Sequence, residues 1–84
     1  MPPSVSIALP VYNGARYIEL AVRSLLVQSG DIEIVISDDA STDDTVEIIH
    51  SIDAGNIRLI TNVTNGGQFV NLNRALKACL GRYM

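Results

Sequence analysis

Short apolar runs rich in β-branched residues alternate along this chain with longer segments of helical periodicity. The runs at 4–9, 32–37 and 57–61 have the length and the largely apolar composition of strands covered on both faces. Because a helical segment separates each strand from the next, neighbouring strands are expected to run parallel and to be joined by right-handed crossovers. The pattern predicts an α/β fold built on a parallel sheet.

Apolar residues that recur every three or four positions predict three helices between and after these runs. The first is expected over 15–28, with Asn13 as its N-cap and Gly30 as its stop, and the third over 68–80, with Gly81 as its stop. The second is expected to begin near Ser41 or Thr42, whose hydroxyls can cap it, and to end at Gly55. The residues expected on the apolar faces are Ile18, Val22, Leu25 and Leu26, then Val46, Ile49 and Ile52, then Phe69, Leu72, Leu76, Cys79 and Leu80.

Three parallel strands make only half of a doubly wound domain. Residues 82–84 have the character of the first residues of a fourth strand. We therefore expect 1–84 to be the N-terminal portion of a larger domain, truncated at the start of its fourth strand. The open sheet edges of such a piece would favour self-association.

Composition and charge limit the class of partner. Hydrophobic residues make up 48% of the chain, and its six basic residues are scattered within a net charge of −3, which argues against a nucleic-acid surface. No run approaches the ~20 apolar residues that cross a bilayer, and the first residues do not resemble a signal peptide. A single cysteine, Cys79, excludes an internal disulfide. A cytoplasmic location is expected, with any membrane association arising from segments outside these residues.

Polar residues follow the carboxyl end of each expected strand. Pro10-Val11-Tyr12-Asn13 follow the first strand, Asp38-Asp39-Ala40-Ser41 the second, and 62–67 the third. Because the carboxyl ends of parallel strands converge on one edge, where ligands bind, these groups are expected to form a site. Tyr12 offers a flat face to a base, Asp39 an acceptor for an imide N–H or a hydroxyl, and the amides that open the second helix offer donors to an anion. A nucleotide would suit this set.

Other chemistry finds little support in the chain. Neither G-x-G-x-x-G nor G-x-x-x-x-G-K-[ST] occurs, so a bound diphosphate would need a metal ion to neutralise it. No Ser-His-Asp or Cys-His arrangement can be assembled, and His50 has no partner at metal-ligand spacing. His50 is therefore expected to be solvated or packed, and Cys79 to lie in the core.

Plainer interpretations of the same residues stay open. Asp38 and Asp39 can be turn and cap residues, because aspartate favours both positions. Tyr12 can be a half-buried loop aromatic, and 65–67 can be only a turn. The pair at 43–44 is best explained by the helix dipole.

Three blocks of the sequence resemble those of family 2 glycosyltransferases. The segment 5–13 is similar to the opening strand and loop of that family, and 36–45 resembles its V-D-D-G-S-T-D-x-T signature. The Asn65-Gly66-Gly67 triplet, Asn73 and the Gly81-Arg82-Tyr83 triplet resemble its third block, N-G-G-x(5)-N-x(7)-G-x-Y. The blocks occur in order and cover nearly the whole chain.

This resemblance implies a Rossmann-like, A-type glycosyltransferase fold and the transfer of a sugar from a nucleotide-activated donor, commonly a UDP-sugar. The acceptor, a saccharide, a lipid or a protein, stays undefined. The resemblance places Pro10 and Tyr12 at the border of the base and gives Asp39 the contact with the base imide, while Asp38 is more structural. The implied nucleotide-binding residues are Pro10, Val11, Tyr12, Asn13, Asp39 and Ser41, with Asp38, Gly66 and Gly67 as secondary candidates.

Several positions depart from the family pattern. Ala40 stands where the family usually has glycine, Leu72 where arginine is frequent, and Ala75 where glycine is frequent. In the family, an acidic D-x-D motif that binds Mg2+ or Mn2+, and the catalytic base, come after the position of Met84. The 84 residues are therefore expected to hold no catalytic or metal-binding residue and to be inactive alone.

Two other classes compete with a glycosyltransferase. A non-enzymatic α/β binding module such as a signalling receiver would carry its acidic pair after the first strand, whereas here the pair follows the second. An interaction module with open sheet edges would self-associate.

Overall fold

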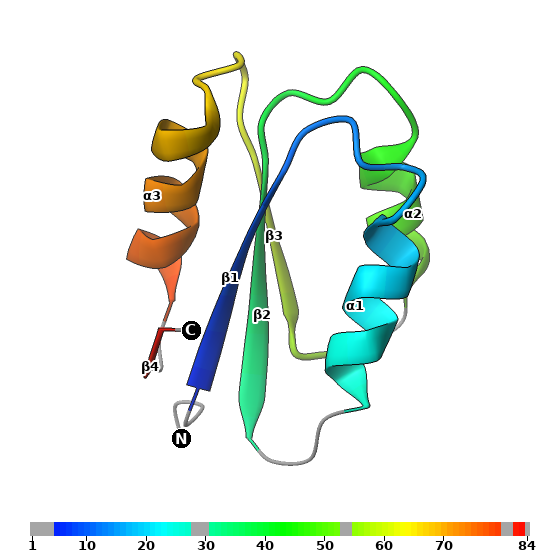
Figure 1. Ribbon diagram of the computed structural model, residues 1–84, viewed down its shortest axis with the longest axis vertical. Helices are drawn as coiled ribbons and strands as arrows, with labels where there is room; N and C mark the ends of the chain where they lie inside the picture. Colours follow the sequence, from blue (N-terminus) through cyan, green and yellow to red (C-terminus); the bar gives the residue numbers. More distant parts are fainter. Residues whose placement is uncertain (1–4, 28–30, 53–54, 80–81, 84) are drawn as a thin grey trace.

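The sheet and its helices form three layers (Figure 1). The computed structural model describes residues 5–27, 31–52, 55–79 and 82–83. Helices α1 and α2 cover one face of the sheet, and α3 covers the other. The element bounds are β1 Val5–Val11, α1 Ile18–Leu26, β2 Ile32–Asp38, α2 Thr45–Ser51, β3 Ile57–Thr61, α3 Gln68–Ala78 and β4 Arg82–Tyr83.

All the strand pairs in this sheet are parallel, and the strand order is β3-β2-β1-β4. The fourth strand pairs with Val5 and Ser6 at the start of β1. The predicted α/β class, with strands and helices alternating around an open parallel sheet, is therefore confirmed.

The three long strands end level with one another at the carboxyl edge of the sheet. Val11 is paired with Asp38, and Asp38 with Thr61. The amide of Asp39 donates to the carbonyl of Val11 at 2.9 Å, and the amide of Asn62 donates to the carbonyl of Asp38 at 2.8 Å. These contacts carry the pairing one residue further, so the three following loops leave the sheet from one edge.

Apolar side chains fill the space between the sheet and the α1–α2 layer. The predicted faces of these two helices point inward, and Ile18, Val22 and Ile49 are buried there. They meet Ile34 and Ile36 of β2, both fully buried. Burial of this apolar surface is the main source of stability for the layer.

The prediction for the inward face of α3 was wrong for Phe69 and Leu72, whereas the predicted Leu76 and Cys79 are half-buried and Leu80 lies outside the described residues. Phe69 is 85% exposed and Leu72 is 37% exposed, whereas Asn71 and Ala75 are buried against the sheet. A neighbouring stripe one residue earlier in the sequence therefore faces inward, because a small side chain lets the helix approach this side of the sheet. Polar side chains are buried on that side too: the hydroxyl of Ser6 donates to the Glu33 carboxylate at 2.7 Å.

The first strand is longer and the first helix shorter than predicted. β1 does not end before Pro10, which pairs in register with Ser37. The carbonyl of Val11 faces β2, where it accepts the amide of Asp39, so the backbone nitrogen of the adjacent Pro10 faces away from β2 and its missing N–H costs the β1–β2 pair no hydrogen bond. The carbonyl of Gly14 accepts from the amides of Tyr17 and Ile18, so a turn precedes α1 and Asn13 is not its N-cap.

The second helix also begins later than predicted, at Thr45. Neither Ser41 nor Thr42 caps it; the Asp43 carboxylate instead accepts the amide of Thr45 at 3.0 Å. The helix ends at Ser51 rather than at Gly55.

Some expectations lie at or beyond the limits of the described residues. α3 ends at Ala78, and the predicted stop residues Gly30 and Gly81 fall outside the described residues.

His50 is exposed, as expected. Cys79 is only half-buried, and burial, the largest effect on it, raises the pKa of its thiol. Within the described ranges, no helix has the length and apolarity needed to cross a membrane.

Candidate functional site

An open cleft of about 510 Å³ lies at the carboxyl edge of the sheet, bordered by the first loop, which follows β1, and by the start of α3. Among the predicted site residues, it brings together Pro10, Val11, Tyr12, Asp39 and Gly67. The predicted residues Asn13, Asp38, Ser41 and Gly66 do not line it. Asn65, from the loop 62–67 expected at the site, also lines it. Lining residues that the sequence did not single out for the site are Tyr17, Gln68, Phe69, Asn71 and Leu72.

Aromatic side chains give the cleft flat apolar surfaces. Tyr12 is 49% exposed and Tyr17 is 51% exposed, and Phe69 is the most open of the three. Leu72, at the position where arginine is frequent in the family, adds a further apolar side chain. Exposed faces of this kind stack well on a planar ring such as a nucleobase.

The carboxylate of Asp39 is the acceptor of the cleft, and it is only 2% exposed. Its Oδ1 accepts from the amide of Gly66 at 3.0 Å and from Nδ2 of Asn62 at 3.1 Å. Its Oδ2 accepts from the amide of Gly67 at 3.0 Å and more weakly from that of Gly66 at 3.2 Å. The Gly66 amide, with help from Asn62 and Gly67, outweighs burial and holds the pKa of Asp39 below its usual value.

The neighbouring carboxylate, Asp38, turns away from the cleft and holds the strand-to-helix turn. Its two oxygens accept from the amide of Ser41 at 3.0 Å and from the hydroxyl of Ser41 at 2.6 Å. The pair at the end of β2 is thus divided: one carboxylate closes a turn, and the other faces the cleft.

Hydrogen bonds hold the first loop, which follows β1, against the second loop, which follows β2. The amide of Asn13 donates to the hydroxyl of Ser41 at 2.8 Å, and the Asn13 side chain accepts from the amide of Thr42 at 2.8 Å. The amide of Gly14 donates to the hydroxyl of Thr45 at 2.9 Å. Asn13 and Ser41 therefore join two loops instead of lining the cleft.

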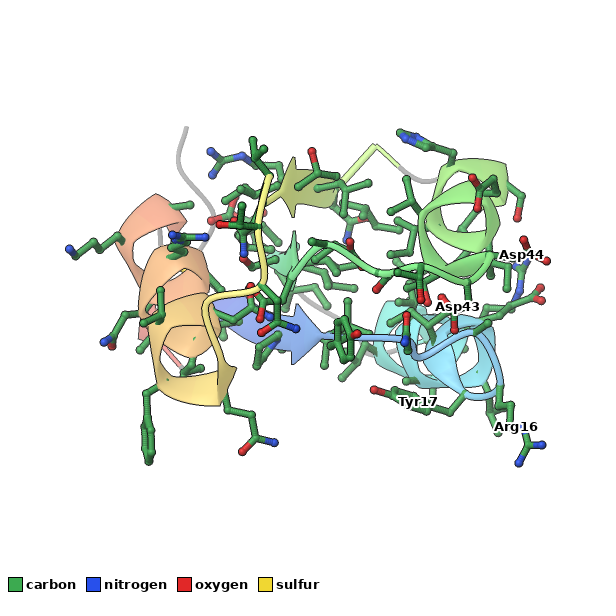
Figure 2. All side chains as sticks on the ribbon, turned by 90° about the horizontal axis from the view of Figure 1, so that it is seen from above. Arg16, Tyr17, Asp43 and Asp44 are labelled. Carbon is green, nitrogen blue, oxygen red and sulfur yellow. The ribbon has the colours of Figure 1, made fainter. Side chains whose placement is uncertain are left out.

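Asp43 lies between these loops, whereas Arg16 points outward (Figure 2). Oδ2 of Asp43 accepts a hydrogen bond from the amide of Ala15 at 3.2 Å, and Oδ1 of Asp43 accepts from the amide and the hydroxyl of Thr45. The hydroxyl of Thr45 contributes most to a lowered pKa of Asp43. Side chains already accept the amides of 41, 42 and 45, so these three amides are occupied.

Ala40 has a backbone φ of 63°, in the left-handed region that disfavours a β-carbon. We expect Ala40→Gly to raise the free energy of unfolding by up to about 1 kcal/mol, as measured by urea denaturation. Ala21→Gly, inside α1, is expected to lower it by a similar amount. If Ala40→Gly lowers the free energy of unfolding as Ala21→Gly does, the left-handed backbone at Ala40 does not strain the fold.

Potential metal ligands do not gather among the residues that the structure describes. Within the described ranges, no group of three or more His, Cys, Asp or Glu side chains could hold a metal ion. The described residues therefore do not fit a Mg2+ or Mn2+ site, and the acidic residues near the cleft make hydrogen bonds to protein groups instead.

Comparison with known proteins gives the family. The model of "Glycosyl transferase family 2" matches residues 6–84. The chain is 40% identical over 84 residues to a chondroitin synthase of Pasteurella multocida, covering 98% of this chain and 9% of that protein.

Solved structures agree with that match. S. aureus TarS 1-349 superposes with a TM-score of 0.87 and 31% identity, covering 96% of this chain and 26% of that one. A structure of the same protein in complex with UDP gives a TM-score of 0.84. The mannosyltransferase PcManGT from Pyrobaculum calidifontis, in complex with GDP-Man and Mn2+, gives 0.79 with 27% identity, covering 92% of this chain and 24% of that one. The chain has the A-type glycosyltransferase fold that the sequence predicted, and it belongs to glycosyltransferase family 2.

Proposed function

We propose that this chain is the nucleotide-binding portion of an enzyme that transfers a sugar from a UDP-sugar to an acceptor. One observation carries the proposal: the cleft at the carboxyl edge combines exposed aromatic faces with a single ionised carboxylate. Ligands of open α/β sheets bind at this edge. The UDP complex of TarS and the GDP-Man complex of PcManGT support a nucleotide as the ligand.

The base is proposed to stack on Tyr12 beside Pro10, and its imide N–H to donate to Asp39. Uracil presents one N–H between two carbonyl groups, so a lone carboxylate next to backbone amides complements its edge. Asn13 and Ser41 are given a supporting role, because their hydrogen bonds hold the loop that carries Tyr12.

A base must compete for the Asp39 carboxylate, since that group is nearly inaccessible and already accepts from three donors. The Asn62 donor comes from a half-buried side chain, whereas the two amide donors come from the exposed residues Gly66 and Gly67. The base N–H is therefore proposed to replace an amide of this glycine pair. Both residues lie beside the cleft without needing to touch the ligand themselves.

Catalysis needs groups that the described residues do not supply. We place the ligands of Mg2+ or Mn2+ and the catalytic base of the whole enzyme outside these 84 residues, and no step is assigned to the residues described. A bound divalent ion would stabilise the departing diphosphate.

Titration of UDP into the chain, followed by calorimetry, tests the proposed function. Saturable binding of one equivalent is expected, and hydrogen exchange at the amides of Gly66 and Gly67 should become faster as the base displaces them. GDP and ADP serve as comparison ligands, with weaker binding expected for both. Absence of UDP binding, or equal affinity for all three, would count against a uridine site.

A further inference from the structure

Two asparagines link the end of β1 to the carboxylate of Asp39. Nδ2 of Asn62 donates to Oδ1 of Asp39 at 3.1 Å and to Oδ1 of Asn71 at 3.0 Å. Nδ2 of Asn71 donates to the carbonyl of Val11 at 3.3 Å. Since the same carbonyl accepts the backbone amide of Asp39 at 2.9 Å, the contacts form a closed ring that begins and ends at Asp39.

Each hydrogen bond in this ring has a fixed direction. Both neighbours of the Asn62 side chain are oxygen atoms, so Asn62 must turn its nitrogen toward them. Asn71 must then present its oxygen to Asn62, which leaves its nitrogen for the Val11 carbonyl. Both amides are locked in one orientation, and the locked donor fixes the plane of the Asp39 carboxylate.

Asn71 has no evident value as a packing residue. It is 3% exposed on the inward stripe of α3, where Ala75, one turn further, is fully buried. A buried amide gains little over an apolar side chain unless its hydrogen bonds serve a purpose, because its desolvation must first be offset. Asn71 nevertheless lines the cleft beside Asp39.

The donors on the two oxygens of Asp39 differ in kind. Oδ1 accepts the amide of Gly66 at 3.0 Å and also a side-chain donor, Asn62, that is held from behind by Asn71. Oδ2 accepts only amides of the exposed pair Gly66 and Gly67. Oδ2 is therefore the oxygen that can exchange its partner for a ligand N–H while the ring holds Oδ1.

We propose that Asn71, acting through Asn62, is a positioning residue that aims Oδ2 of Asp39 at the N–H of a uracil base. This inference rests on the proposed function and assigns selectivity for the base to residues behind the cleft. Removal of Asn71 leaves Asn62 without its second acceptor, so the carboxylate loses its fixed plane although Asp39 itself is unchanged.

The test compares the affinities of UDP and CDP for the chain and its variants. Cytosine has nearly the size of uracil, but a lone pair replaces the N3–H, so a carboxylate aimed at N3 discriminates against it. The unchanged chain is expected to prefer UDP by at least about tenfold, the effect of one charge-assisted hydrogen bond. In Asn71→Ala this preference should fall to within about threefold, through weaker UDP binding.

Two further variants make the result decisive. Asn62→Ala breaks the ring at a half-buried position and should lose the preference in the same way, even if Asn71→Ala fails to fold. Asn73→Ala replaces an exposed asparagine of the same helix and should keep it. Thermal unfolding of each variant separates a loss of folding from a loss of selectivity.

The outcomes separate this inference from the function on which it rests. If the chain prefers UDP over CDP and both ring variants keep that preference, the positioning role is wrong and the uridine site stands. If the unchanged chain binds no UDP, the proposed function fails and the inference fails with it. If only the ring variants, Asn62→Ala and Asn71→Ala, lose the preference for UDP, the result supports both the uridine site and the positioning role.

Discussion

Replacing Asp39 with asparagine is expected to weaken UDP binding by at least about tenfold, because a charge-assisted hydrogen bond to the base is lost. The substitution keeps the size of the side chain but exchanges one acceptor oxygen for an NH2 group. Asn62, Gly66 and Gly67 all donate to this carboxylate, so in Asp39→Asn at least one donor would face another donor. The loop after β3 should therefore also lose its anchor and the chain its full thermal stability.

Asp44→Asn is the matched control for this substitution. Asp44 is exposed near the start of α2, lies on the outside of the molecule in Figure 2, and makes no side-chain cap to that helix. Its removal should leave UDP affinity unchanged, as measured by calorimetry, and should lower the melting temperature only slightly, by the loss of one charge at the start of α2. Equal UDP affinity in the two variants would show that Asp39 does not read the base.

The same carboxylate should give the stability of the chain a dependence on pH. The pKa of Asp39 is lowered in the folded chain, chiefly by the amide of Gly66, so its hydrogen bonds stabilise the fold above the unfolded pKa of about 3.9. That contribution is lost as the pH falls below this value and through the lower pKa of the folded state. Asp39→Asn should show a smaller loss of stability over that acidic range, with Asp43 accounting for part of the remainder.

Gly14→Ala is expected to destabilise the chain by about 1–3 kcal/mol, because no room exists for a β-carbon. Such an atom would lie 2.6 Å from Cγ2 of Val11 and 2.8 Å from Cζ of Tyr17. Val11 is 3% exposed and packs in the core, so it cannot yield. Tyr17 would be pushed from the cleft, and the amide of Gly14 would be drawn from the hydroxyl of Thr45. UDP affinity should fall together with stability.

Gly55→Ala provides the control, since a β-carbon there meets no atom within 4 Å. Urea denaturation should show a lower free energy of unfolding for Gly14→Ala and nearly no change for Gly55→Ala. Similar values for the two variants would mean that the first loop can relax around a side chain.

Periodicity predicted the order of elements because apolar β-branched runs leave few alternatives in a chain of this length. Periodicity failed to predict the ends of strands and the inward faces of helices where these depend on contacts with residues distant in the sequence. The extension of β1 through Pro10 depends on its register with Ser37 of the neighbouring strand. The inward stripe of α3 depends on the polar side of the sheet that it meets, which no count of apolar residues in 68–80 reveals.

The candidate site was predicted in its chemistry more than in its geometry. Strand-end topology placed Tyr12 and Asp39 in one cleft, as the structure has them. The sequence could not predict that both carboxylate oxygens of Asp39 already accept hydrogen bonds, because the donors are mostly backbone amides from the loop after β3. The only sequence signal for Asn71 is an asparagine one helical turn before Ala75, on a stripe that is recognisable once its direction is known.

The central claim is that uridine nucleotides bind in the cleft at the carboxyl edge and contact Asp39. Chemical-shift mapping of the 15N-labelled chain during titration with UDP tests it most directly. The account predicts saturable shifts concentrated at the amides of Tyr12, Asp39, Gly67 and Phe69, and much smaller shifts in Asp39→Asn at a UDP concentration near the Kd of the unchanged chain. No shifts at high UDP concentration, or shifts centred on the opposite edge of the sheet near Ile32 and Ile57, would contradict it.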